Sequence, residues 1–358
     1  MINTNSPTEL DSLKIRIPYR NVEIIDPKLE GTQINYIVET DEIMKEFKNN
    51  SLKFKTDGIS TRFAIEVMPT NNKGSKKKYL TILINSKLLT KPYLEGITKN
   101  NIDVIYKHLM AYNVVRFDLQ TLLEGFVTDA DFKTDVRCTM EEVQELKKFF
   151  IINSKQSNKL GVGYQPFNDK TNQGIQFSNR ETKAYKTNPF IKMYHKELEL
   201  KYHSTEFYKK YIKGQDVKDL VRFETTIKNN SHLKALGITS NTLSHLLNLD
   251  DKVKKNILSM SINAHLESNI KQVKKREGMS PSDIVNYNFI VSLMNYGQTF
   301  ERVREIALDG ITDKVAKSRK KSMLNKVYTD YIQGSKKDIS TKNIDSILNL
   351  IGVDNDKR

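Results

Sequence analysis

Two short segments combine side chains that could cleave and rejoin a phosphodiester. The first is Tyr194-His-Lys196-Glu-Leu-Glu199, and the second is Arg222-Phe-Glu224. A phenol with its ordinary pKa of about 10 is a poor nucleophile at neutral pH, so a neighbouring ammonium or metal cation must favour the phenolate. These residue types indicate phosphoryl transfer with Tyr194 as nucleophile and Lys196 as its cationic partner. The competing interpretation is that Tyr194 is a packed strand aromatic.

Carboxylates in the same regions predict a divalent metal, Mg²⁺ or Mn²⁺, that would polarise the phosphate. The expected ligands are Asp131, Glu199 and Glu224, and the substitutes are Asp118, Asp129 and Asp135. Ordinary surface pairing with lysine is the alternative for each carboxylate taken alone. No two of the six histidines are separated by one residue, which excludes a metal held by a His-x-His pair. His195 is expected at the surface, facing away from Tyr194.

The elements that position these side chains are predicted from periodicity. Leu13–Pro18, Arg62–Val67, Phe190–Lys196 and Leu220–Ile227 are rich in β-branched and aromatic residues, which favours strands. Alternate strand residues share a face, so Tyr194 should lie with Lys196, and Arg222 with Glu224.

Helices are predicted where capping signals precede apolar runs. Thr139 and Glu142 have the capping-box spacing, and Ser280-Pro-Ser-Asp283 precedes a second apolar run. We therefore predict an α+β fold, with antiparallel sheets and packed helices in a nicking-joining region over 1–230. An all-helical C-terminal region over 231–358 should follow and contact duplex DNA.

Composition restricts the class of protein. Lys and Arg number 58 against 43 Asp and Glu, a net charge of +15, which favours a polyanionic partner such as nucleic acid. A lysine-rich surface kept for solubility is the alternative. The sequence has neither a membrane-length apolar run nor a signal-peptide pattern, and its single cysteine excludes a disulfide framework. These features predict a protein of a reducing, bacterial host cytoplasm with no membrane partner.

Four segments resemble a known family of phage and plasmid replication proteins, typified by the gene II nicking enzyme of filamentous phages. They are Leu10–Pro18 (LDSLKIRIP), Thr128–Val136 (TDADFKTDV), Ile191–Glu199 (IKMYHKELE) and Leu220–Ile238 (LVRFETTIKNNSHLKALGI). The rolling-circle initiators of staphylococcal-type plasmids are similar more distantly. One departure is Asp129, which stands where the family commonly has an Arg.

The resemblance implies a rolling-circle replication initiator with an initiator-like fold. Tyr194 would nick one origin strand, keep the bond as a 5′-phosphotyrosine and rejoin it after synthesis, with Lys196 as electrostatic partner and Asp131, Glu199 and Glu224 at the acidic positions. Its partners would be origin DNA, as supercoiled duplex and displaced single strand, and the host helicase and polymerase.

The DNA contacts expected from the sequence are basic residues. They are Arg180, Lys183, Lys186, Lys192, Arg222, Arg319 and Lys320. A solvated charged face is the alternative for each group. Candidates for a second nucleophile are Tyr185, Tyr202, Tyr208 and Tyr211. The competing function is a replication or partition protein that binds DNA without cutting it, whereas a tyrosine recombinase is disfavoured because the chain has no His-x-x-Arg.

Overall fold

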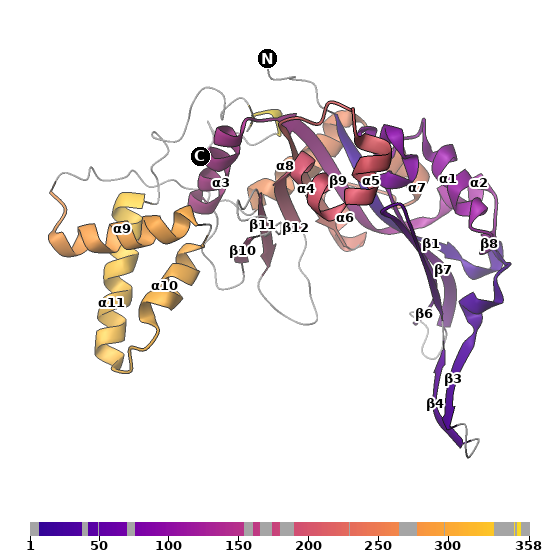
Figure 1. The fold of residues 1–358 in the computed structure, drawn as a ribbon, viewed down its shortest axis with the longest axis horizontal. Coiled ribbons are helices and arrows are strands. Elements are labelled where there is room, and N and C mark those ends of the chain that lie inside the picture. The colour runs from indigo at the N-terminus through magenta and orange to yellow at the C-terminus, as the bar shows by residue number, and fades with distance from the viewer. Residues whose placement is uncertain are drawn as a thin grey trace.

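The structure is a computed structural model and has an α+β fold (Figure 1). It describes residues 7–37, 42–48, 50–69, 76–153, 160–164, 174–179, 190–228, 230–264, 278–296, 298–332, 347 and 349–351. Within these ranges, no helix is both long enough and apolar enough to span a bilayer.

A nine-stranded antiparallel sheet forms the centre of the molecule. In spatial order its strands are β10 (Leu160–Tyr164), β11 (Gly174–Asn179), β12 (Phe190–His195), β13 (Leu220–Ile227), β9 (Phe126–Arg137), β1 (Thr8–Pro18), β7 (Lys76–Asn85), β6 (Ile59–Pro69) and β5 (Ser51–Thr56). The strands predicted from Leu13–Pro18, Arg62–Val67 and Leu220–Ile227 are therefore confirmed. Phe190–Lys196 is confirmed except for its last residue, which begins a helix.

The sheet has one apolar face because its strands alternate in polarity. In β1, Leu13, Ile15 and Ile17 are buried, whereas Lys14 and Arg16 point to the opposite face. Helices cover the apolar face and complete two hydrophobic cores with it. They include α1 (Ile102–Ala111), α2 (Leu119–Glu124), α3 (Met140–Asn153), α7 (Leu243–Leu247) and α8 (Asp251–Ala264).

The opposite face carries the polar residues and is covered in part by short elements. They are η3 (Ser86–Leu89), η4 (Lys91–Glu95), α4 (Lys196–His203), α5 (Thr205–Phe207) and the π-helical turn η5 (Tyr208–Ile212). A β-bulge between β1 and β9 falls between Leu10 and Ser12 and leaves Asp11 as the extra residue. Bulges re-aim side chains, and here the carboxylate of Asp11 reaches the guanidinium of Arg222 on the polar side.

Two small sheets and short helical turns complete this part. Their bounds are η1 (Tyr19–Asn21), β2 (Glu23–Ile24) paired with β8 (Val115–Arg116), η2 (Pro27–Glu30), and β3 (Thr32–Ile37) paired with β4 (Glu42–Lys48). The β3–β4 hairpin extends away from the central sheet at the lower right of Figure 1.

After β13 the described elements are helical, as the sequence predicts. However, α6 (Asn230–Ala235), α7 and α8 still contribute Leu233, Leu243 and Leu258 to the cores beneath the sheet. A separate hydrophobic core is formed by α9 (Pro281–Asn295), α10 (Phe300–Leu308), α11 (Lys314–Val327) and the π-helical turn η6 (Tyr328–Ile332). The boundary expected at residue 230 thus falls among helices that pack on the sheet.

Both predicted capping signals are present. Thr139 and Glu142 make the two reciprocal bonds of a capping box before α3, at 2.7 and 3.3 Å. The Ser280 hydroxyl accepts from the Asp283 amide at 3.1 Å and begins α9, whose first residue is Pro281.

Candidate active site

Strand register brings the sequence-predicted residues onto one face of the sheet. Tyr194 of β12 lies opposite Arg222 of β13, which lies opposite Asp135 of β9. One step along, Lys192 lies opposite Glu224. Cross-strand partners in an antiparallel sheet point to the same side. Side chains from η3, η4 and α4 pack over these strand residues and complete a group that we call the polar cluster. Its members are Asp11, Lys87, Tyr93, Asp131, Lys133, Asp135, Lys192, Tyr194, Lys196, Glu199, Arg222 and Glu224.

Tyr194 is at the centre of the polar cluster, with a residue exposure of 6%. Its phenol donates a hydrogen bond to Oε2 of Glu224 at 2.9 Å, and Nζ of Lys196 is 3.5 Å from the same oxygen. Burial and then the charge of Glu224 raise the pKa of the phenol well above its ordinary value. The phenol is therefore neutral at neutral pH, and the adjacent carboxylate is placed to accept its proton.

Lys196 was expected to favour the phenolate form of Tyr194, and the geometry does not support that role. Its ammonium does reach the phenol, although β12 ends at His195 and Lys196 is the first residue of α4. Its positive charge does not make Tyr194 acidic, because burial and Glu224 outweigh it. His195 lies on the apolar side, opposite Val221, and is 2% exposed, so the surface position expected for it is wrong.

Glu199 belongs to a chain of hydrogen bonds from α4 to η3. Its Oε2 accepts from Lys196 at 2.7 Å, and its Oε1 accepts from Ser204, which in turn accepts from Lys87 at 2.6 Å. Burial alone would raise the pKa of Glu199, but the charges of Lys196 and Lys87 lower it. Glu199 is thus an ionised carboxylate already neutralised by protein cations.

Asp131 has the opposite electrostatic environment. Burial and then the negative charge of Glu224 raise its pKa to about 7, although Lys192 and a hydrogen bond from Thr226 act against the shift. Lys192 is bonded to Oε1 of Glu224 at 2.5 Å. Asp131 and Glu224 are therefore two carboxyl groups that repel each other when both are ionised.

The predicted three-carboxylate metal set is not assembled in the described part of the chain, where no group of three or more His, Cys, Asp or Glu side chains is arranged to hold a metal ion. Asp131 and Glu224 influence each other's charge, whereas Glu199 is bound to Lys196. The substitute Asp118 caps α2 instead, accepting from the Thr121 amide at 2.6 Å. Burial raises the pKa of another substitute, Asp129.

Arg222 is the buried ionic centre of the cluster and has no exposed surface. Its Nε and a terminal nitrogen bind both oxygens of Asp135 at 2.7 and 2.8 Å, and its other terminal nitrogen binds Asp11 at 2.8 Å. Burial alone would raise the pKa of Asp11, but Arg222 and Lys196 lower it to about 2. Arg222, which was expected to contact phosphate, instead binds this internal network: its Nε and both terminal nitrogens donate to carboxylates, and one terminal nitrogen also donates to Tyr93.

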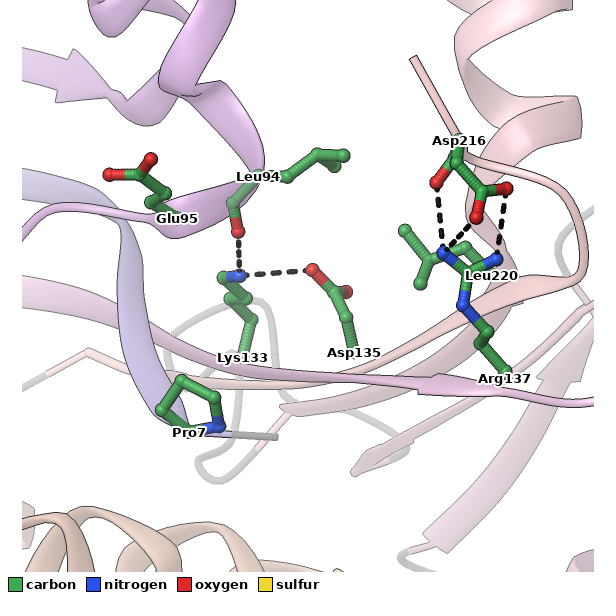
Figure 2. Close-up of a pocket in the computed structure, with 8 residues that line it drawn as sticks. All are labelled: Pro7, Leu94, Glu95, Lys133, Asp135, Arg137, Asp216 and Leu220. Atoms are coloured by element: carbon green, nitrogen blue, oxygen red, sulfur yellow. Dashed lines mark hydrogen bonds and ion pairs between the residues drawn. The ribbon is translucent and has the colours of Figure 1, made fainter. Parts of the chain in front are cut away.

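A pocket of about 220 Å³ opens at one end of the cluster (Figure 2). Lys133 lies at its base, where its ammonium binds Asp135 at 2.9 Å and also donates to the carbonyl of Leu94. Arg137 lies on the rim, held by Asp216 at 2.9 Å. Four of the residues that line the pocket form two ion pairs, Lys133 with Asp135 and Arg137 with Asp216, so the network that fixes Arg222 extends to the surface here.

Sequence reasoning missed five members of the cluster. Four of the five are residues it did not single out, Asp11, Lys87, Tyr93 and Lys133; the fifth, Asp135, was named only as a substitute metal ligand, and its binding of Arg222 was missed. Asp11 and Lys133 had a detectable signal, because charged residues interrupt otherwise apolar strands. Tyr93 had none: it comes from η4, a short turn between Thr90 and Gly96, both at positive φ.

Tyr93 is the second phenol of the cluster, where it accepts from Arg222 at 3.3 Å. The expected second nucleophiles lie elsewhere. Tyr202 is 55% exposed, Tyr211 hydrogen-bonds Asp57, and Tyr208 packs against the main core. Tyr185 falls outside the described residues.

The remaining DNA-binding predictions separate into three groups. Arg180, Lys183 and Lys186 lie outside the described residues. Lys192 is in the cluster, with 23% of its side chain exposed. Arg319 and Lys320 lie on α11; Arg319 is exposed, whereas Lys320 donates to Asn286 of α9 at 2.8 Å.

Comparisons with family models, curated proteins and solved structures yield no match to this chain.

Proposed function

We propose that this chain is a DNA nicking and joining enzyme that starts rolling-circle replication with Tyr194 as its nucleophile. The observation that supports this most strongly is the arrangement of a carboxylate and an ammonium around one phenol oxygen. A carboxylate accepts its proton at 2.9 Å, an ammonium lies 3.5 Å away, and the group is enclosed by ionised side chains. A nucleophile, a base and a cation in hydrogen-bond reach are the components of covalent catalysis.

In the proposed reaction the phenol oxygen attacks phosphorus as its proton moves to Glu224. The new bond joins Tyr194 to a 5′ phosphate, and the bond from phosphorus to the 3′ oxygen breaks, leaving a 3′-hydroxyl after proton uptake from solvent. Because burial keeps the phenol protonated, attack depends on this proton transfer. The phosphotyrosyl ester conserves the bond, so the reverse reaction rejoins the strand without another energy source.

Lys192 is the cation that we expect to meet the phosphate first. Its side chain is 23% exposed, compared with 3% for Lys196 and none for Arg222. When Lys192 leaves Glu224 for a phosphate, the carboxylate loses its competing proton donor and becomes a stronger base. Lys196 remains beside the oxygen and stabilises the charge that develops there. Substrate binding and base activation are thereby coupled.

Asp131 and Glu224 are the residues of this site that fit a divalent metal such as Mg²⁺ or Mn²⁺. Burial and then the charge of Glu224 raise the pKa of Asp131, so a cation bound beside the pair would favour the ionised form of both carboxyl groups. Hard cations prefer carboxylate oxygens, and a cation bound there would stabilise negative charge on the phosphate. Glu199 fits less well, because the charges of Lys196 and Lys87 already lower its pKa and compensate its negative charge.

The test compares Tyr194→Phe with Tyr202→Phe, a control that removes an exposed phenol from α4. Each purified protein is mixed with Mg²⁺ and a supercoiled plasmid carrying the replicon that encodes the chain. The wild type and the control should produce open circles and a protein–DNA adduct, and Tyr194→Phe neither. Equal nicking by both variants would remove Tyr194 from the reaction.

A second candidate is a replication or partition protein that binds DNA without cutting it. The near-complete burial of Tyr194 favours this function, because no phosphate can reach the phenol until part of the cluster moves. If Tyr194→Phe supports full replication of the replicon in cells, the binding function is correct and the nicking function is not.

A further inference from the structure

The C-terminal helices α9, α10 and α11 form a unit with its own apolar core. Ile290, Val303 and Leu324, one from each helix, are fully buried. Phe300 stacks on Tyr328 with ring centroids 3.9 Å apart. A five-residue turn, Asp309–Asp313, joins α10 to α11 and lies at the end of the unit remote from α9 (Figure 1). We call α9–α11 the helical unit.

The first half of α11 extends beyond this core. Every residue from Thr312 to Arg319 is exposed, and the first fully buried residue of the helix is Leu324. Exposure on all sides is unusual for a helix that only covers a core, since such a helix buries a continuous stripe. It includes an apolar side chain, Val315, which is 58% exposed.

This projecting segment is strongly basic. Its exposed cations are Lys314, Lys317, Arg319 and Lys321, which we call the basic face. No Asp or Glu occurs in α11 itself, and within the described residues none of these four side chains is paired with a carboxylate. Charges left unpaired and close together repel one another, so their arrangement does not serve the stability of α11.

Two other cations of α11 have a different role. Lys320 donates to the 2%-exposed Asn286, and Lys326 lies 3.2 Å from Asp283; both partners belong to α9. These contacts hold α11 against α9, whereas the four residues of the basic face are exposed. The helical unit thus separates cations that hold α11 in place from cations that are free for a ligand.

We propose that the basic face binds duplex DNA, with the first half of α11 in the major groove. An α-helix with its side chains is about 10–12 Å across, which matches a major groove about 12 Å wide. Four unpaired cations suit phosphates on both sides of the groove, and Val315 can contact thymine methyl groups. Single strands are disfavoured, because α11 has no aromatic residue on which an unpaired base could stack.

This surface is independent of the chemistry proposed for Tyr194. The helical unit would hold duplex DNA, and the polar cluster would act on one strand. The two proposals can therefore fail separately: a binding protein without catalysis keeps the basic face, and a nicking enzyme that recognises only single strands does not use it.

The experiment measures fluorescence anisotropy of a labelled 20-base-pair duplex and of the matching single strand across a salt series. The test variant is Lys314→Gln, Lys317→Gln, Arg319→Gln and Lys321→Gln combined. The matched control neutralises four exposed lysines of the sheet region, Lys91, Lys99, Lys209 and Lys234. Because each phosphate contact contributes about 0.9 to the slope of log K against log salt, the test variant should lose about 3 to 4 from that slope and on the order of 100-fold in affinity. The control should change little.

Three further measurements separate a loss of DNA contacts from misfolding and from a loss of catalysis. The test variant should unfold at the wild-type temperature and should still form the adduct on a single-stranded oligonucleotide, since neither property uses the basic face. Tyr194→Phe should bind the duplex like the wild type. Unchanged duplex affinity in the test variant, loss of single-strand binding alone, or an equal loss in the control would overturn the proposal.

Discussion

Replacing Asp131 by asparagine should stabilise the protein at pH 8 more than at pH 5. The carboxyl group has a pKa of about 7 in the folded chain, against an ordinary value of 3.8. A raised pKa means that the folded state binds the proton more tightly. The stabilisation from that proton is complete below pH 4 and is lost as the pH rises through 7. Asparagine keeps a side-chain oxygen that can accept the hydrogen bond from Thr226, and it does not titrate in this pH range.

The size of the effect follows from the shift. A shift of about three pKa units corresponds to about 4 kcal/mol over the full range, and the part that falls between pH 5 and pH 8 is about 3 kcal/mol. For a chain of this length that difference corresponds to about 5 °C in the unfolding temperature. It is an upper value, because the buried site can relax when Asp131 ionises.

The assay is urea unfolding of wild type and Asp131→Asn at both pH values, with EDTA present so that no divalent cation neutralises the pair. Asp11 has a lowered pKa, about 2, and gives stability that is lost as the pH falls toward 2, the opposite sense. Only the difference between the two proteins therefore isolates Asp131. A change in that difference of less than about 0.5 kcal/mol, the range of ordinary surface substitutions, would refute the burial of Asp131 beside Glu224.

Three other substitutions test the cluster. Glu224→Gln should reduce the nicking rate about 10²- to 10⁴-fold, because it removes the group that accepts the phenol proton; unchanged kinetics would exclude Glu224 as the base. Lys196→Met should reduce the chemical step about 10²- to 10³-fold with little change in DNA affinity, measured by single-turnover kinetics against binding; a loss of affinity alone would contradict its assignment. Arg222→Met should destabilise the fold by about 3–5 kcal/mol in urea titrations, since it leaves Asp11 and Asp135 as buried, unpaired carboxylates, whereas an exposed arginine would lose almost nothing.

The fold class and the main site strands were predictable because their signals are local. β-branched runs define β12 and β13, and Ser280 and the Thr139–Glu142 pair mark helix starts through bonds to neighbouring amides. The strand rule also placed Arg222 and Glu224 on one face correctly, since it depends only on alternation along a strand.

What the sequence did not reveal depends on contacts between distant segments. The contact of Arg222 with Asp11 joins residues 211 positions apart through a β-bulge, which leaves no pattern in the sequence. A basic residue can contact DNA at the surface or bind carboxylates in the interior. Which of the two it does depends on the carboxylates that the fold brings next to it. For the same reason Glu199, grouped with the metal ligands by its spacing, is bound to a lysine one turn away.

The most direct measurement of the central claim is mass mapping of the residue that carries DNA after the reaction. The protein is incubated with Mg²⁺ and the supercoiled replicon, the DNA is digested to a short stub, and tryptic peptides are sequenced by mass spectrometry. We expect a single nucleotide-bearing peptide with the modification on Tyr194, and no such peptide from Tyr194→Phe. A modification on Tyr93 or Tyr202, or nicked DNA with no covalent peptide, would contradict the assignment of Tyr194 as nucleophile.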